Sequence, residues 1–178
     1  MLFSVDPEIP SLLKSLVMMC GMFLPDDPEP EWNASVDPHA AAIVYRAAVP
    51  IHRSVGLDVT TKTQMSEEYL EALKRADNPQ TDFIYAITKH YIGMYKSFGI
   101  SKMPVHDSSA MAYAIDPSLF TTKKAFVDVE YHSPFHEGQT VADWRGQRGH
   151  EPNVDVCVDV DSERMLEMYA QRLTGASA

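Results

Sequence analysis

Two short polar segments carry the residues that could do chemistry, and the first is Pro104-Val105-His106-Asp107-Ser108. It stands between a predicted loop and a predicted helix start. Asp107 could cap that helix by accepting its free backbone N–H groups, or it could be a hard oxygen ligand for Ca²⁺ or Mg²⁺. In the second case His106 could act as a proton donor, because an unperturbed imidazole titrates near neutral pH. This pair alone does not complete a calcium site, since Ca²⁺ takes about six to eight oxygen ligands.

The second segment is Glu31-Trp32-Asn33, in a predicted loop that follows a predicted strand. Its carboxylate accepts hydrogen bonds, and its amide both donates and accepts them, so together they could bind a polyhydroxylated ligand. The alternative is a solvated acid beside an asparagine that forms a turn.

Other catalytic patterns do not occur in the sequence. No two histidines show the helical i, i+4 spacing of a zinc motif with a glutamate between them, and there is neither a phosphate-binding glycine loop nor a Gly-x-Ser-x-Gly motif. A phosphohydrolase metal site around His106 and Asp107 would need further His and Asp ligands at suitable spacing, and we find none.

The elements that must position these residues alternate between strand and helix signals. We expect strands at Leu16–Cys20, Ile51–Val59, Lys123–Tyr131, Gln139–Trp144 and Val154–Val160. We expect helices at His39–Ala48, from Ser66 to Asn78, and at Thr81–Phe98, Ser108–Ala114 and Ser162–Leu173. This alternation predicts an α/β fold with an open, mostly parallel, Rossmann-like sheet flanked by helices. Ligands of such sheets bind beyond the carboxyl ends of the strands, which favours loops 21–33, 59–65 and 103–107.

The composition narrows the classes of partner. The chain has 178 residues, which fits a single domain, and its 25 acidic against 15 basic residues give a net charge of −10. Such a charge repels nucleic-acid polymers.

No apolar run is long enough to cross a membrane, and the N-terminus has no basic region typical of a secretory signal. Cys20 and Cys157 are expected to be buried free thiols, which favours a cytoplasmic location.

Five segments in order resemble the inosine–uridine-preferring nucleoside hydrolase family. Residues 31–41 are similar to its Glu-Phe-Asn-Ile segment followed by Asp-Pro-Glu-Ala-Ala, and residues 55–60 to its Pro-Leu-Asp-Val-Thr segment. Residues 105–120 resemble its His-Asp-Pro motif and the following helix, with Ser108 in place of the proline. Residues 138–146 and 151–156 match its late strands. The resemblance covers roughly residues 8–173.

The resemblance implies a hydrolase of nucleoside catabolism, a glycosidase that cleaves the N-glycosidic bond of a ribonucleoside to give ribose and a free base. In this family a Ca²⁺ ion holds the ribose hydroxyls and activates the attacking water. By motif match, Asp107 would ligate calcium and His106 would face the leaving base as a catalytic residue. Glu31 and Asn33 would bind the ribose hydroxyls, with Glu31 at the 5′ end. The choice between purine and pyrimidine would depend on aromatic and His side chains, for which Tyr85, His90, Tyr91 and Tyr95 are candidates.

The sequence also departs from the family pattern. The family's Asp-rich calcium motif is absent, and Pro25, Asp26 and Asp27 stand where a Gly-Asn pair is expected. We therefore expect a single, N-terminally truncated nucleoside hydrolase-like domain, 1–178, with a partial fold and impaired activity on its own. The alternative is a non-catalytic pseudo-enzyme or binding module of the same fold. An exposed sheet edge would favour a homo-oligomer.

Overall fold

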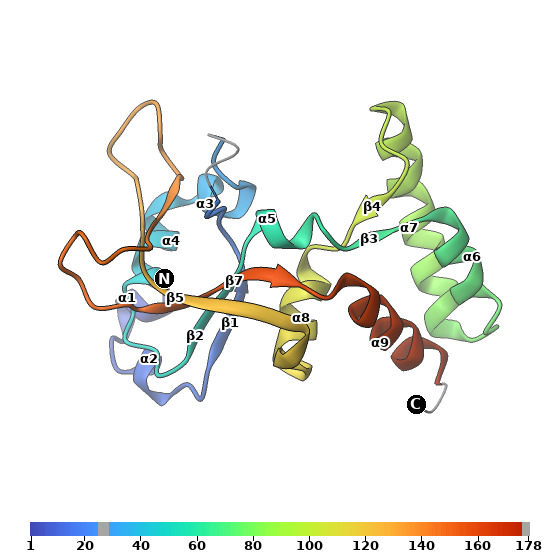
Figure 1. Ribbon diagram of the computed structural model, residues 1–178, viewed down its shortest axis with the longest axis horizontal. Helices are drawn as coiled ribbons and strands as arrows, with labels where there is room; N and C mark the ends of the chain where they lie inside the picture. Colours follow the sequence, from blue (N-terminus) through green and yellow to red (C-terminus); the bar gives the residue numbers. More distant parts are fainter. Residues whose placement is uncertain (25–28, 176–178) are drawn as a thin grey trace.

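The computed structural model describes residues 1–24 and 29–175, and its main feature is a five-stranded sheet in the order β1-β2-β7-β5-β6 (Figure 1). The strands are β1 (Leu16–Met19), β2 (His52–Val55), β5 (Phe120–Val129), β6 (Thr140–Asp143) and β7 (Val154–Val160). Strands β1, β2 and β7 are parallel, β5 is antiparallel to β7, and β6 is antiparallel to β5. Four of these five described strands thus point the same way, which confirms the predicted α/β fold with an open, mostly parallel sheet.

Helices cover both faces of the sheet and extend beyond it. Helix α4 (Pro38–Tyr45) packs on β5 on one face, and α8 (Asp107–Ile115) packs on β1 and β2 on the other. Helices α6 (Glu67–Lys74), α7 (Pro79–Ser97) and α9 (Ser162–Thr174) contact one another beside the sheet (Figure 1). The short elements are α1 (Leu2–Val5), α2 (Ile9–Leu12), α3 (Trp32–Val36), α5 (Leu57–Thr60), η1 (Pro117–Leu119), and the antiparallel pair β3 (Gln64–Met65) and β4 (Met103–Pro104).

Two apolar clusters hold these layers together. One lies between the sheet and α8 and continues to α6, α7 and α9, with Val55, Tyr113, Cys157 and Met165 fully or almost fully buried. The other lies under α4 on the opposite face, around Tyr45. Because both clusters use the same sheet, burial of apolar surface fixes α4 on one face of the sheet and α8 on the other.

Helix caps explain why several elements begin where the sequence predicted. The side chains of Asp37, Ser66, Asn78 and Asp161 each accept a backbone N–H of the helix that follows, and Pro38 and Pro79 occupy first helical positions. These caps confirm the predicted starts of α4, α6, α7 and α9 to within a few residues.

Two predictions of elements were wrong. The strand predicted over Ile51–Val59 ends at Val55, and residues 57–60 form α5. The chain leaves the strand here because Leu57 N donates to Gly21 O (2.8 Å), in the loop after β1. The loop predicted through residue 33 ends earlier, since α3 begins at Trp32. Pro25, Asp26 and Asp27 lie outside the described residues.

Candidate active site

The segments expected to carry chemistry meet at the carboxyl ends of β1 and β2. Helix α3 follows the loop after β1, and α5 follows β2 directly, so both stand at the same end of these parallel strands (Figure 1). The hydrogen bond between Leu57 N and Gly21 O ties the two loops together. This is the edge at which ligands of α/β sheets bind.

Glu31 is buried at this edge, with 3% of its surface exposed. Its Oε2 accepts hydrogen bonds from Gly21 N (2.9 Å) and Ala34 N (3.2 Å), and its Oε1 accepts one from Asn33 N (2.8 Å). The carboxylate therefore caps α3 and joins it to the end of β1, so the interpretation as a solvated acid was wrong. A carboxylate has about four lone-pair sites, so three of them are in use and about one is left for a ligand.

Asn33 is exposed on α3, and its side chain is hydrogen-bonded to the end of β1. Its Nδ2 donates to Met19 O (3.0 Å), the last carbonyl of β1, and also contacts Met19 Sδ (3.3 Å). Its Oδ1 has no partner among the described residues. The alternative of a turn-forming asparagine was wrong, because the residue is helical and its amide is oriented by the strand.

His106 is positioned by two threonines of one other segment, residues 60–63. Val105 N donates to Thr63 O (2.9 Å), and His106 Nδ1 lies 2.8 Å from Thr60 Oγ1. Burial lowers the pKa of His106, while the charges of Asp107 and Glu31 partly oppose that shift. Gly21 bonds both Glu31 and Leu57 of α5, and Thr60 of α5 contacts His106, so the two predicted segments lie at the same edge of the sheet.

Asp107 is the first residue of α8 and is exposed. Its carboxylate accepts no hydrogen bond from the described part of the chain, and His106 at the N-cap makes no side-chain cap, so the capping interpretation of Asp107 was wrong. Within residues 1–24 and 29–175 no group of three His, Cys, Asp or Glu side chains could hold a metal ion. Asp107 alone does not supply the roughly six to eight oxygen ligands that Ca²⁺ takes.

Two hollows adjoin these residues. A groove of about 460 Å³ runs between α7 and the start of α8, lined by His106, Asp107, Tyr91 and Tyr95 among others. Of the four candidate contacts for a base, Tyr91 and Tyr95 line this groove. Tyr85 instead bonds Glu71 on α6, and His90 is exposed with its ring nearly perpendicular to that of Tyr91.

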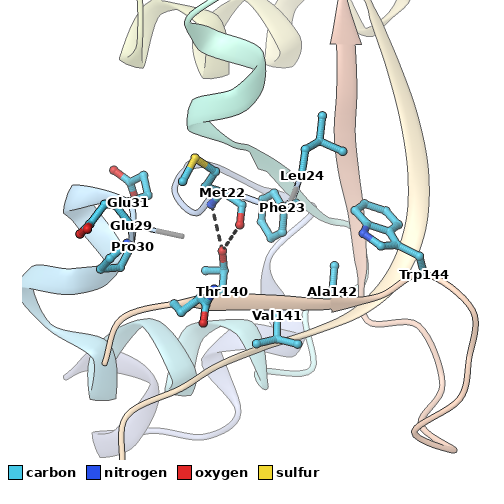
Figure 2. Close-up of a pocket in the computed structure, with 11 residues that line it drawn as sticks. Met22, Phe23, Leu24, Glu29, Pro30, Glu31, Thr140, Val141, Ala142 and Trp144 are labelled. Carbon is cyan, nitrogen blue, oxygen red and sulfur yellow. Dashed lines mark hydrogen bonds between the residues drawn. The ribbon is translucent and has the colours of Figure 1, made fainter. Parts of the chain in front are cut away.

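The other hollow, of about 490 Å³, has Glu29 and Glu31 at one end and apolar side chains at the other (Figure 2). The apolar side chains are those of Leu24, Ala142 and Trp144. Thr140 Oγ1 accepts from Met22 N (2.9 Å) and donates to Met22 O (2.7 Å), which fixes the loop after β1 against β6 (Figure 2).

Sequence reasoning missed two polar residues of this edge, Asp58 and Thr60, both on α5. Asp58 Oδ2 accepts hydrogen bonds from Phe23 N (3.3 Å) and Leu24 N (3.0 Å), and burial raises the pKa of Asp58. Thr60 is fully buried against His106. Their signal was Gly56, since a glycine inside a predicted strand can mark its end, and polar side chains follow it.

Comparisons with known proteins identify the family of the chain. The sequence profile of the family described as inosine-uridine preferring nucleoside hydrolase matches residues 1–167. The chain belongs to this nucleoside hydrolase family. It is 34% identical over 177 residues to the pyrimidine-specific ribonucleoside hydrolase RihA of Escherichia coli, covering 97% of this chain and 57% of that protein.

Solved structures of nucleoside hydrolases share the fold. A purine-preferring ribonucleoside hydrolase from Gardnerella vaginalis superimposes with a TM-score of 0.87 at 28% identity, over 97% of this chain and 56% of the other. A plant nucleoside hydrolase superimposes with the same TM-score at 27% identity, over 97% of this chain and 57% of the other. The chain thus spans somewhat more than half the length of these relatives. In the described residues, no helix has the length and apolar character needed to span a bilayer.

Proposed function

We propose that this site serves the hydrolysis of the N-glycosidic bond of ribonucleosides, with ribose and a free base as products. The observation that carries the proposal is a series of hydrogen bonds at one edge of the sheet, beside an aromatic groove. Gly21 bonds both Glu31 and α5, and Thr60 of α5 contacts His106. The relatives' names include pyrimidine-specific and purine-preferring enzymes, so the proposal extends to ribonucleosides and not to one base.

Each residue has a role that its contacts support. Asn33 presents Oδ1 to a ribose hydroxyl, because Nδ2 is occupied by the Met19 carbonyl. Glu31 holds Asn33 in place through the cap of α3, and its remaining lone pair could accept from the 5′ hydroxyl. Tyr91 and Tyr95 offer aromatic faces to the base.

His106 is the catalytic residue of the proposal. As the bond between C1′ and the base nitrogen breaks, the base receives the electron pair, and His106 can deliver a proton to it. Water supplies the hydroxyl group to C1′, where positive charge develops in the transition state.

Calcium enters the proposal through one residue. The exposed Asp107 carboxylate is a suitable hard oxygen ligand beside His106, and Ca²⁺ would supply activation of the water. The described residues do not provide the remaining ligands, so we derive no step through the metal.

The lack of further metal ligands in the described residues favours a second function. Without a cluster of carboxylates in the described residues, the chain could bind a ribonucleoside without cleaving it, as a pseudo-enzyme or binding module. Activity of this chain alone is accordingly expected to be slight.

The experiment measures binding and cleavage separately. Saturation-transfer NMR with uridine and inosine should detect binding, and Asn33→Ala should weaken it by about tenfold, the effect of one lost hydrogen bond. The matched control is Gln147→Ala, which removes an exposed amide elsewhere. Absence of ribonucleoside binding would contradict both functions.

Chromatography of the same mixtures then distinguishes the two functions. Slow release of free base that His106→Ala abolishes would support hydrolysis, and binding without release would support the binding module. Substantial turnover that is lost on chelation would contradict our expectation of impaired activity.

Three broader proposals accompany this function. The described residues act as one domain, since both core clusters share one sheet. A cytoplasmic location is supported by Cys20 and Cys157, both free and buried. A homo-oligomer is supported by β1, an edge strand of the described sheet with β2 as its one strand neighbour.

A further inference from the structure

The contact between Thr60 and His106 is short and partly buried, and it has no role in the function proposed above. Thr60 Oγ1 lies 2.8 Å from His106 Nδ1, and the threonine is fully buried. The two residues come from different parts of the chain, at the end of α5 and just before α8. A buried hydroxyl group in contact with a ring nitrogen restricts both the rotation of that ring and the position of its hydrogen.

A second acceptor near Thr60 determines the direction of this hydrogen bond. Thr60 Oγ1 also lies 3.3 Å from Leu57 O. A hydroxyl group has one hydrogen, and a carbonyl oxygen can only accept. Both contacts are therefore hydrogen bonds only if Nδ1–H donates to Oγ1 and the hydroxyl donates to Leu57 O. This chain of two bonds satisfies the buried hydroxyl group fully, as buried polar groups require.

We infer that Thr60 is a positioning residue that holds neutral His106 in the Nδ1–H tautomer, which leaves Nε2 as the nitrogen that exchanges protons. Nε2 has no partner in the described part of the chain, and His106 lines the groove beside α7. The inference rests on the proposed function for its chemical purpose, but the tautomer itself is a property of the unliganded chain.

The proton balance of the site follows from this tautomer. A proton from solvent adds to the Nε2 lone pair, and the Nδ1–H bond to Thr60 is unchanged. When the glycosidic bond breaks, the Nε2–H bond breaks and an N–H bond forms on the base, with the electron pair the base has gained. The ring returns to its starting tautomer without rotating. If Thr60 instead donated to Nδ1, it would stabilise the ring only while Nδ1 stayed unprotonated, and that bond would have to be broken on protonation.

The two threonine variants separate hydroxyl chemistry from packing. Thr60→Ser keeps the hydroxyl group and loses a methyl group, while Thr60→Val keeps the shape and loses the hydroxyl group. Two-bond ¹H–¹⁵N correlation spectra of the histidine rings, recorded at about pH 8 where an ordinary imidazole is neutral, report the tautomer directly. Assignment of the ring follows from the signals that disappear in His106→Gln.

We expect a pyrrole-type Nδ1 and a pyridine-type Nε2 for His106 in the unmodified chain and in Thr60→Ser. In Thr60→Val we expect a shift of the population toward Nε2–H. An Nε2–H tautomer in the unmodified chain would overturn the inference, and this measurement needs no variant to fold. A spectrum of folded Thr60→Val identical to that of the unmodified chain would also overturn it. Neither result depends on turnover, and uridine binding, measured on the same sample, tests the proposed function separately.

Discussion

Glu31 has a structural role that its position in a segment expected to bind ribose did not indicate. Its carboxylate accepts three backbone N–H groups, from Gly21, Asn33 and Ala34, in a buried environment. Glu31→Ala would leave these donors without an acceptor, and we expect a loss of about 2–4 kcal/mol in the free energy of unfolding. Glu31→Gln should lose less, because one amide oxygen can still accept from Gly21 and Ala34. Urea denaturation measures both.

Glu151→Ala is the matched control for this prediction, since Glu151 is exposed and has no hydrogen bond in the described residues. If Glu31→Ala and Glu151→Ala had the same free energy of unfolding, the capping role would be refuted.

His52 gives the molecule a dependence of stability on pH. It is 3% exposed, is stacked on Tyr45, and neither ring nitrogen has a partner in the described residues. Burial lowers the pKa of His52 to about 4. Between about pH 6.5 and 4 the unfolded chain therefore binds a proton that the folded chain does not. Burial of neutral His52 therefore costs no proton above about pH 6.5. As the pH drops from there to 4, the free energy of unfolding falls by up to about 3 kcal/mol.

The measurement is urea denaturation at several pH values from 7 to about 4. His52→Phe keeps the ring stack and removes the titration, so its stability relative to the unmodified chain should rise as the pH falls. His136→Phe, at an exposed position, should track the unmodified chain. Parallel curves for the unmodified chain and His52→Phe would exclude His52 as the source.

At the scale of residues, the sequence predicted which side chains lie at the site. It did not predict which of their polar atoms are already hydrogen-bonded within the protein. The segments of Glu31 and His106 were predicted to form one site, and hydrogen bonds through Gly21 and α5 connect them at one edge of the sheet. The capping carboxylate turned out to be Glu31 and not Asp107, because a cap depends on the local entry angle of the chain, which residue type alone does not reveal. Asp58 and Thr60 were missed because the strand before them was predicted to continue.

At the scale of elements, the turn between β5 and β6 supports the helix that carries Asn33. Gly138 has a φ of +87°, and a Cβ atom there would lie 2.6 Å from Ser35 Cα on α3. Gly138→Ala should therefore cost more than the roughly 1–2 kcal/mol of a left-handed alanine, because the backbone of α3 would have to move. We expect about 3 kcal/mol or more in denaturation experiments, together with weaker uridine binding.

Gly146→Ala is a matched control, because Gly146 also has a positive φ, +67°, but no atom lies within 4 Å of the added Cβ. The difference between the two variants isolates the contact with α3. Equal losses would mean that the turn does not support the site.

Elements with strong local signals were predicted well. The strand at Val154–Val160 and the helix from Ser162 follow from an apolar run and an Asp cap. Helix α5 and the pair β3–β4 were not predicted, because each has at most four residues and depends on long-range bonds such as Leu57 N to Gly21 O and Val105 N to Thr63 O. Short elements of this kind form through tertiary contacts, not through the propensity of their own residues.

At the scale of the whole molecule, an edge strand and a large net charge act against each other. Strand β1 has a neighbour on one side in the described sheet, and its four residues are half-buried. Such an edge favours pairing with a second copy, whereas a net charge of −10 on each chain opposes it. Added salt screens the repulsion without weakening backbone hydrogen bonds, so association should increase from low to physiological ionic strength.

Light scattering over a range of protein and salt concentrations tests this balance. We expect a dimer that becomes more populated with salt, and Leu16→Lys should reduce it by placing a charge on the edge strand. Leu16 belongs to neither buried cluster, so the variant should fold. Leu12→Lys, at an exposed position on α2 before β1, adds the same charge outside the sheet and should reduce association less. A monomer under all conditions, or equal effects of the two lysines, would show that β1 is not the surface of association.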